Sequence, residues 1–164
     1  MPEIPLTQGQ VAIVDDVDYE FLTQFKWCAG KYKKGFYAVR TALKDEPNPG
    51  QTILMHRVLA ERMGFDAPQI DHADRDQLNN RRSNLRRASA SQNSHNQGMP
   101  SHNTSGYMGV TYRERLGKWV AQTNHEGKYY YLGIFDDPAK ASEVYKKKKR
   151  ELAGEFTPEE IKDA

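Results

Sequence analysis

The sequence contains a single cysteine, Cys28, among its 164 residues. One cysteine cannot form an intramolecular disulfide, and it cannot build a cysteine-based zinc cluster. No apolar run approaches the length of a membrane span, and the first ten residues lack a signal-peptide pattern. These absences favour a reducing, cytoplasmic setting and no membrane partner.

An excess of charge of one sign is also missing. Lys and Arg together number 24 against 22 Asp and Glu, which gives a net charge of +2. Such a small net charge does not by itself indicate a nucleic-acid partner, so the positions of the charges matter more. The length allows one domain or two small ones, and 37% hydrophobic with 28% charged residues is ordinary for a globular protein.

Positive charge gathers in the stretch from Ile70 to Asn96, IDHADRDQLNNRRSNLRRASASQNSHN. It holds five arginines against three aspartates, and this local excess would attract a phosphate backbone. The stretch also places an Asp next to a His and is rich in Asn, which makes a poor core sequence. Its composition indicates a metal-dependent phosphodiesterase site.

Cleavage of a phosphodiester needs a base for the attacking water and a positive charge near the leaving oxygen. His72 suits the first task, because its unperturbed pKa lies near neutrality. Asp71 suits the second as a ligand of Mg²⁺, which prefers oxygen donors. If Asp71 and His72 lay on a regular strand, their side chains would point to opposite faces. We therefore expect the strand to end or bulge here, and the polar run that starts at Asp74 favours an ending.

A second oxygen ligand is expected from the following helix. Ser89 to Gln92 fits the S-x-x-Q capping box, which predicts that a short helix starts at Ser89. Asn93 then lies in or just beyond its first turn, with Asn96 on the same face. The side-chain carbonyl of Asn93 is therefore the candidate partner of Asp71 at the metal.

These residues form a pattern that resembles the HNH (His-Me finger) nucleases, specifically the phage and intron-encoded homing endonucleases. The matching positions are Asp71-His72, Asn80-Arg81, Asn84-Leu85-Arg86 and Gln92-Asn93, with Asn96. The resemblance implies a ββα-metal finger at about residues 68–96, in a bacterial or phage-infected cell. It implies that His72 is the general base, that Asp71 and Asn93 hold one divalent ion, Mg²⁺ or Mn²⁺, and that Asn84 braces the loop that orients the histidine. The alternative is a solvated polar loop with a capped helix.

The amino-terminal part before the finger is predicted to be rich in strands. The expected elements are a strand at 11–14, a helical turn at 15–22, a hairpin at 26–40, a strand at 52–54 and a helix at about 56–63. The hairpin aromatics, Trp27 among them, are interpreted as core residues rather than base-stacking residues. His56 is interpreted as a packing residue, and Arg57 beside it could touch a phosphate. The predicted DNA contacts of this first domain are Arg57, Arg81, Arg86 and Asn96.

A linker of turn-forming residues is expected at 97–106. The predicted domains are therefore a nuclease domain at 1–96, a second domain at 107–156 and a tail at 157–164. In the second domain we expect strands at 107–113, 118–124 and 128–135, then a helix capped by Asp137 and Pro138 and ended by Gly154. One face of that helix is apolar, and the Lys146–Arg150 run is interpreted as its solvated face.

The second domain resembles the APETALA/ethylene-response-factor DNA-binding domain. The matching residues are Tyr107, Gly109-Val110, Gly117-Lys118-Trp119, Leu132-Gly133 and Phe135. The resemblance implies a three-stranded sheet in the major groove with a helix packed behind it. Strand alternation then assigns Trp119, Ala121, Tyr130 and Leu132 to the helix side. The residues assigned to DNA are Thr111, Arg113, Lys118, Gln122, Tyr129 and Tyr131. This face has fewer arginines than the plant pattern, so no base preference is implied.

The expected fold class is α+β, a ββα-metal finger on a strand-rich part followed by a small three-stranded antiparallel sheet packed on one helix. The expected function is a site-specific, metal-dependent endonuclease of the homing type, which cuts double-stranded DNA at a site chosen by the carboxy-terminal domain. A monomer would nick and a weak dimer could cut both strands. The alternatives are a DNA-binding regulator with a vestigial finger and an RNA-binding protein that uses the Lys33-Lys34 hairpin.

Overall fold

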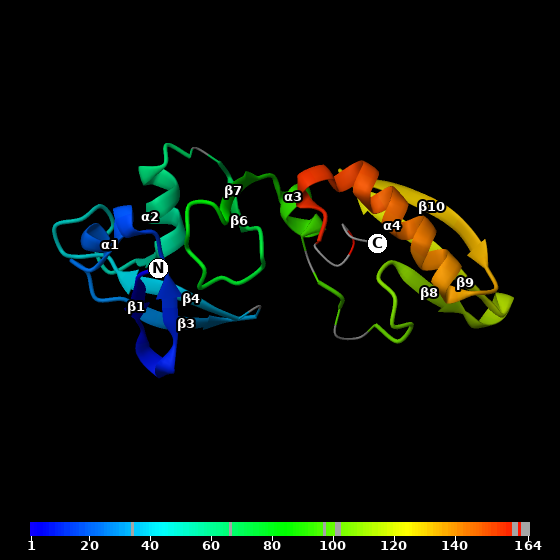
Figure 1. Cartoon of the computed structure of the whole chain (residues 1–164), viewed down its shortest axis with the longest axis horizontal. Coiled ribbons are helices and arrows are strands. Elements are labelled where there is room, and N and C mark those ends of the chain that lie inside the picture. Colours follow the sequence, from blue (N-terminus) through cyan, green and yellow to red (C-terminus); the bar gives the residue numbers. More distant parts are fainter. Residues whose placement is uncertain (34, 66, 97, 101–102, 159–160, 162–164) are drawn as a thin grey trace. The chain divides into compact units, whose positions relative to one another are not determined.

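The computed structural model describes residues 1–33, 35–65, 67–96, 98–100, 103–158 and 161. The chain divides into two compact units, Met1–Ser89 and Ala90–Ala164 (Figure 1). The predicted linker at 97–106 lies inside the second unit, and Gln97, Ser101 and His102 of that linker lie outside the described residues. Among the residues described, no helix is both long and apolar enough to cross a bilayer.

The first unit is built from small antiparallel sheets and short helices. Its strands are β1 (Glu3–Pro5), β2 (Val11–Ile13), β3 (Cys28–Tyr32), β4 (Gly35–Thr41), β5 (Thr52–Leu54), β6 (Gln69–His72) and β7 (Leu85–Ala88), and its helices are a 3-10 turn (Thr7–Gly9), α1 (Asp16–Leu22) and α2 (Met55–Arg62). Strand β1 pairs with β2, β4 lies between β3 and β5, and β6 pairs with β7. The strand-rich character predicted for this part is therefore confirmed.

Local sequence signals located most of these elements. The predicted strands at 11–14 and 52–54 and helices at 15–22 and 56–63 match β2, β5, α1 and α2 to within one residue. The predicted hairpin corresponds to β3 and β4, and Lys34 in its turn lies outside the described residues. Strand β1 was not predicted, because three residues are too few to show a period.

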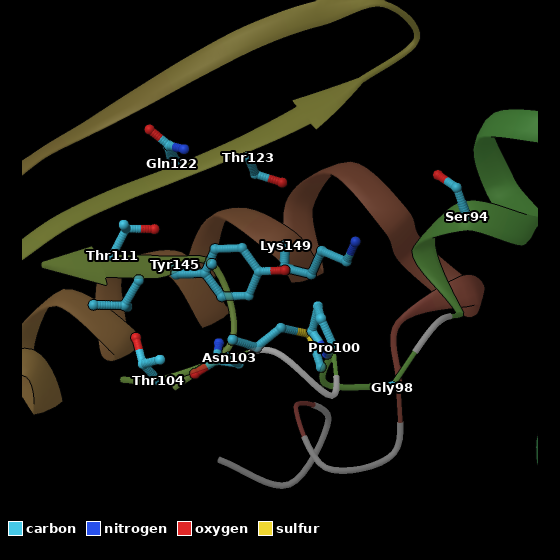
Figure 2. A pocket seen from close by; sticks show the side chains of 13 residues that line it. Ser94, Gly98, Pro100, Asn103, Thr104, Thr111, Gln122, Thr123, Tyr145 and Lys149 are labelled. Atoms are coloured by element: carbon cyan, nitrogen blue, oxygen red, sulfur yellow. The ribbon is translucent and has the colours of Figure 1, made fainter. Parts of the chain in front are cut away.

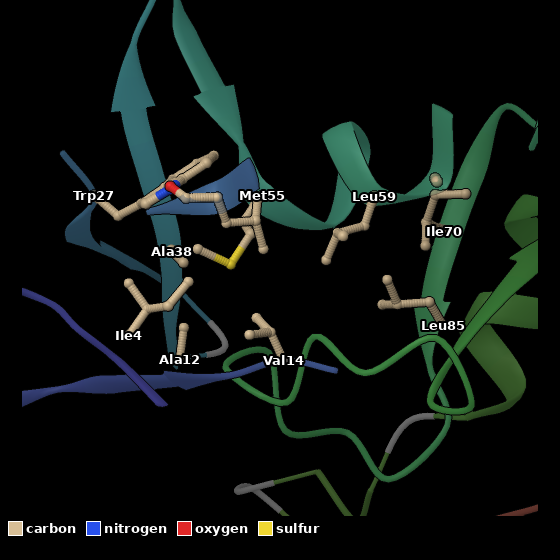
Figure 3. Packing of buried hydrophobic residues seen from close by; sticks show 11 residues of the cluster. Ile4, Ala12, Val14, Trp27, Ala38, Met55, Leu59, Ile70 and Leu85 are labelled. Carbon is tan, nitrogen blue, oxygen red and sulfur yellow. The ribbon is translucent and has the colours of Figure 1, made fainter. Parts of the chain in front are cut away.

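The core of the first unit joins the finger strands to the amino-terminal elements (Figure 3). Leu22, Met55 and Leu59 are fully buried, and Ile70 of β6 and Leu85 of β7 belong to the same cluster. Trp27 is also in this cluster, and its indole N–H donates to the Leu22 carbonyl at 2.8 Å. The core interpretation of the hairpin aromatics is therefore confirmed for Trp27 and wrong for Tyr32, which is 47% exposed. Strands β6 and β7 are anchored by apolar burial on one face.

The second unit is an antiparallel sheet packed on a long helix. Its elements are α3 (Ala90–His95), β8 (Val110–Arg113), β9 (Lys118–His125), β10 (Lys128–Phe135), α4 (Pro138–Ala153) and short 3-10 helices at Glu114–Leu116 and Gly154–Phe156. The strand order is β10-β9-β8. Val110 and Ala121 of the sheet pack against Ala141 and Tyr145 of α4. The predicted sheet-and-helix arrangement is therefore present.

Helix α4 begins and ends where its capping residues predict. The Asp137 carboxylate accepts a hydrogen bond from the Ala139 N–H at 2.8 Å, and Pro138 occupies the first helical position, where no N–H is needed. Gly154 ends the helix with a positive φ of 52°. Each signal acts within a few residues, so sequence alone sufficed here.

The lysine run on α4 corrects one interpretation. We expected Lys146–Arg150 to be a solvated face, but Lys149 is only 6% exposed. Lys149 follows Tyr145 by four residues, so the two side chains lie on the same face of the helix, which is the buried one. Burial lowers the pKa of Lys149 to about 8.

Candidate active site

His72 is the last residue of β6, so the strand ends at the point that the following polar run predicts. In the β6–β7 ladder Asp71 is opposite Arg86 and His72 is opposite Leu85. Side chains at successive strand positions point to opposite faces, so Asp71 and His72 diverge at their Cβ atoms. They remain electrostatically coupled, because the Asp71 carboxylate is among the charges that raise the pKa of His72.

The imidazole of His72 lies in a cluster of rings. It is 5% exposed, and its ring centre is 5.1 Å from that of His56 and 6.2 Å from that of Tyr37. Burial lowers the pKa of His72, against the raising effects of its hydrogen bond with the Asn80 side chain and of nearby aspartates. His72 is therefore neutral at pH 7, and the neutral ring is the form that can accept a proton from water.

His56 is the packing residue that the sequence suggested. It lies on α2, is 7% exposed and contacts the rings of His72 and Tyr37. Burial, with smaller electrostatic contributions from His72 and Arg57, lowers the pKa of His56 to about 3. Tyr37 was not predicted at this site, because its place on β4 beside His72 depends on contacts between distant segments.

The loop from Ala73 to Asn84 is held by a network of side-chain amides. Asn84 accepts a hydrogen bond from the Asp74 N–H at 3.0 Å and donates to the Asp74 carboxylate at 2.8 Å and to the Asn79 carbonyl at 2.7 Å. The Asn79 amide also donates to Asp74 at 2.5 Å, and Arg81 donates to Asn79 at 2.9 Å. Asn84 thus ties both ends of the loop together next to His72.

Replacing Asn84 with alanine is expected to loosen this loop. The variant would lose the three hydrogen bonds of the buried Asn84 side chain, which costs about 1–3 kcal/mol of unfolding free energy. If Asn84 orients His72, kcat for DNA cleavage falls while KM for DNA stays unchanged. Single-turnover cleavage and urea unfolding would measure both effects. Ser83→Ala, an exposed neighbour in the same loop, is the control, and an equal effect in both variants would show that Asn84 has no special role.

The loop also docks on the amino-terminal strands. The Ile13 N–H donates to the Leu78 carbonyl at 2.9 Å, and the Asn80 N–H donates to the Ile13 carbonyl at 2.7 Å. The Arg82 N–H donates to the Asp15 carboxylate at 2.7 Å. The segment around His72 is therefore supported by residues more than sixty positions earlier in the chain.

A buried carboxylate ties the same loop to two helices. Asp18 of α1 is 1% exposed, accepts from Arg82 at 2.7 and 2.8 Å and pairs with Arg62 of α2 at 3.1 Å. Hydrogen bonding from Arg82 holds the pKa of Asp18 below its usual value, against the effect of burial. Ionised Asp18 therefore stabilises the folded form of the first unit.

This carboxylate predicts a measurable acid sensitivity. A depressed folded-state pKa gives stability that is complete above the unfolded pKa and is lost as pH falls through the folded pKa. Asp18→Asn is expected to cost about 1.5–3 kcal/mol at pH 7, and the gap from wild type should shrink below about pH 4. Urea unfolding across pH would test this, with the exposed Asp16→Asn as control. A gap that is constant with pH would contradict the assignment.

Asp71 has the donor chemistry for a divalent cation but also a protein partner. Arg86 donates to its Oδ2 through Nε at 2.8 Å and Nη2 at 2.7 Å. The described residues contain no group of three or more His, Cys, Asp or Glu that could hold a metal ion. One carboxylate with substrate phosphate is nevertheless a frequent Mg²⁺ arrangement, so the oxygen donors fit this ion.

The other predicted metal ligand, Asn93, lies on α3 in the second unit. Helix α3 begins at Ala90, so Ser89 precedes its first residue as the capping-box pattern predicts. Strands β6 and β7 belong to the first unit, and α3 belongs to the second. Asn93 as a ligand and the metal finger as a whole stay predictions.

The predicted DNA contacts of the finger are in varied environments. Arg57 is exposed and donates to the Ala67 and Pro68 carbonyls at 3.2 and 2.9 Å, Arg81 is bound to Asn79, and Arg86 is paired with Asp71. Asn96 is only 4% exposed, so the structure offers no open surface through which it could contact DNA. The motif gives the position of Asn96 in the sequence, but it does not show whether the side chain is buried in the fold.

The six predicted DNA-facing residues of the second unit lie on one face of the sheet. The register places Arg113 opposite Lys118, Thr111 opposite Val120, and Gln122 opposite Tyr131. Tyr129 is two residues before Tyr131, and its hydroxyl donates to the Gln122 side chain at 2.9 Å. Trp119 and Leu132 pack in the core on the helix side, as alternation predicted.

A cavity of about 440 Å³ lies within the second unit (Figure 2). Thr123 of β9 and Tyr145 and Lys149 of α4 line it, together with Met108 and Asn103 of the preceding segment. No Asp or Glu is among the described residues that line it. All of these residues belong to the second unit.

Comparison with known proteins identifies related sequences. Residues 54–95 match the family described as HNH endonuclease. Protein 3.8 of Escherichia phage T7 is 34% identical over 87 residues, which is 53% of this chain and 71% of that protein. No solved structure shows a significant match. The HNH match includes His56, Asp71, His72 and Asn93, and it ends before the β8-β9-β10 sheet. The resemblance of that sheet to the APETALA/ethylene-response-factor domain therefore stays a prediction.

Proposed function

Because this chain belongs to the family of Protein 3.8 of Escherichia phage T7 and carries an HNH endonuclease domain at residues 54–95, we propose that it is a site-specific, metal-dependent endonuclease of double-stranded DNA. It is an endonuclease of the homing type that hydrolyses phosphodiester bonds, and the second unit chooses the target. The observation that carries this proposal is the buried, neutral His72 at the end of β6, beside a loop that Asn84 braces.

His72 acts as the general base. Its low pKa keeps the ring unprotonated at neutral pH, so it accepts a proton from the water that attacks phosphorus. His56 and Tyr37 pack against the ring and limit its rotation, and Asn84 fixes the loop that follows it. The chain thus supplies a neutral imidazole whose orientation is fixed by its neighbours.

Asp71 and Asn93 are the proposed ligands of one divalent ion, Mg²⁺ or Mn²⁺. Such an ion, when bound, neutralises charge that develops on the leaving oxygen. Arg86 neutralises the Asp71 carboxylate in the absence of other cations. Arg57 and Arg81 lie on the same unit and are proposed to contact the DNA backbone, which positions the duplex without reading its sequence.

Plasmid cleavage tests the proposal. Supercoiled plasmid incubated with the full chain and Mg²⁺ is expected to yield open circles before linear molecules, because one finger per chain cuts one strand. EDTA should abolish cleavage. Linear product formed directly at low enzyme concentration would contradict nicking by a monomer, and DNA binding without cleavage under any divalent metal would favour a regulator with a vestigial finger.

RNA binding is the alternative function to be tested against DNA cleavage. The hairpin at Lys33 carries an exposed Tyr32, which could favour RNA by stacking. Competition of labelled duplex DNA by unlabelled RNA would distinguish the two, and preferential displacement by RNA would overturn the proposal.

A further inference from the structure

The exposed face of the β8-β9-β10 sheet, which we call the reading face, has an ordered distribution of side chains. Its cross-strand rows run from charged to apolar to polar along the strands. The rows are Arg113 with Lys118, then Thr111 with Val120 and Ile134, then Gln122 with Tyr131, then Asn124 with Tyr129. The register determines this order, so the chemistry of the face can be assigned row by row.

Cations occupy only one end of the reading face. Lys118 forms an ion pair with Asp136, which lies just after β10, so part of its charge is already neutralised. Arg113 is exposed at the same end. No Arg or Lys lies in the three rows that follow. Guanine is most often read by Arg or Lys, so this face is poorly equipped to read guanine at its centre.

The centre of the reading face is apolar and open. Tyr131 is 54% exposed and Ile134 is 46% exposed, and Thr111 presents a methyl group in the same row as Ile134. Val120 between them is buried. In the major groove, the apolar feature of a base pair is the thymine methyl group. Burying exposed apolar side chains against that methyl is the favourable use of such a surface.

The polar groups of the same face suit a neighbouring adenine or thymine. The Gln122 side-chain carbonyl accepts a hydrogen bond from the Tyr129 hydroxyl at 2.9 Å, so the amide nitrogen is the donor that this side chain can offer to DNA. An amide donor can reach adenine N7 or thymine O4. Tyr129 therefore acts as a positioning residue for Gln122.

We propose that the reading face recognises thymine-containing steps of duplex DNA, with Ile134, Tyr131 and Thr111 in contact with thymine C5-methyl groups. This inference rests on the proposed function, because it requires that the second unit choose the DNA target. Ile134 and Tyr131 are then specificity-determining residues.

Thymine-to-uracil replacement tests the inference. The full-length chain bearing His72→Ala would first be used to enrich bound duplexes from a random pool, with no cleavage of the bound DNA. In the enriched site each thymine would then be replaced singly by uracil, which removes only the methyl group. We expect the affinity to fall about three- to five-fold at one or two positions, because each replacement removes the burial of one methyl group.

Variants assign the effect to the reading face. In Ile134→Ala the thymine-to-uracil affinity ratio should fall towards one at one of these positions, and Tyr131→Ala should do the same at a position nearby. Both side chains are exposed, so the sheet should remain folded, as circular dichroism would verify. Val144→Ala removes an exposed aliphatic side chain from α4 and should leave the ratio unchanged.

The outcomes separate the two proposals. Two results would overturn thymine reading and leave the endonuclease proposal intact. In the first, no thymine-to-uracil replacement in the enriched site lowers the affinity. In the second, the thymine-to-uracil affinity ratio is the same in Ile134→Ala as in the wild type. Failure of the chain to bind or enrich any duplex would overturn the endonuclease proposal and thymine reading together.

Discussion

Replacing His72 with alanine is expected to slow DNA cleavage by about 10²- to 10⁴-fold, the usual contribution of a general base. In the proposed mechanism the neutral imidazole of His72 accepts the proton of the attacking water, and alanine leaves no acceptor there. Single-turnover nicking of supercoiled plasmid in Mg²⁺ would measure the rate. Binding of DNA should change little, because the phosphate contacts are made by other residues.

Controls distinguish loss of the base from loss of the fold. His72 is buried against His56, so alanine also leaves a void. His72→Gln keeps more of the volume without a group that can accept the proton, and it should be as slow as His72→Ala. His125→Ala removes an imidazole from the second unit and should cleave normally. A folded His72→Gln chain that cleaves at the wild-type rate would refute the assigned role.

Replacing Gly109 with alanine is expected to destabilise the second unit by about 2–5 kcal/mol. Gly109 has a φ of +70°, and a Cβ at this position would lie 2.0 and 2.1 Å from Tyr145 ring carbons. Tyr145 belongs to the core between the sheet and α4, so it has little room to move. Backbone strain and steric overlap therefore add together.

Gly106 provides the matched control. Its φ is +73°, but a Cβ there would meet no atom within 4 Å. Gly106→Ala should therefore lower the free energy of unfolding only through backbone strain, by about 1–2 kcal/mol. The two tryptophans separate the units, since Trp27 lies in the first and Trp119 in the second. Urea unfolding followed by fluorescence in Trp27→Phe chains would report the second unit. Equal losses in the two alanine variants would mean that Tyr145 imposes no constraint.

The second unit illustrates which features local sequence can predict. Asp137, Pro138 and Gly154 set the ends of α4 because a cap acts on backbone groups only a few residues away. Alternation assigned Trp119 and Gln122 to opposite faces, since strand side chains point to opposite sides in turn. The prediction of a solvated Lys149 was wrong, because its four-residue spacing from Tyr145 places it on the buried side of α4.

The environment of the candidate base depended on the tertiary structure. The Asp71-His72 pair and the asparagines around it indicated the candidate site in the sequence, and the polar run predicted the strand end at His72. The packing of His72 with His56 and Tyr37, and the pairing of Asp18 with Arg62 and Arg82 across 44 and 64 residues, required the folded chain. Local propensities extend over a few residues, whereas these contacts form only when the core brings distant segments together. The sequence by itself therefore predicted the residues of the candidate site, whereas the tertiary structure decided the neutral form of His72, its ring neighbours and the contacts that support its loop.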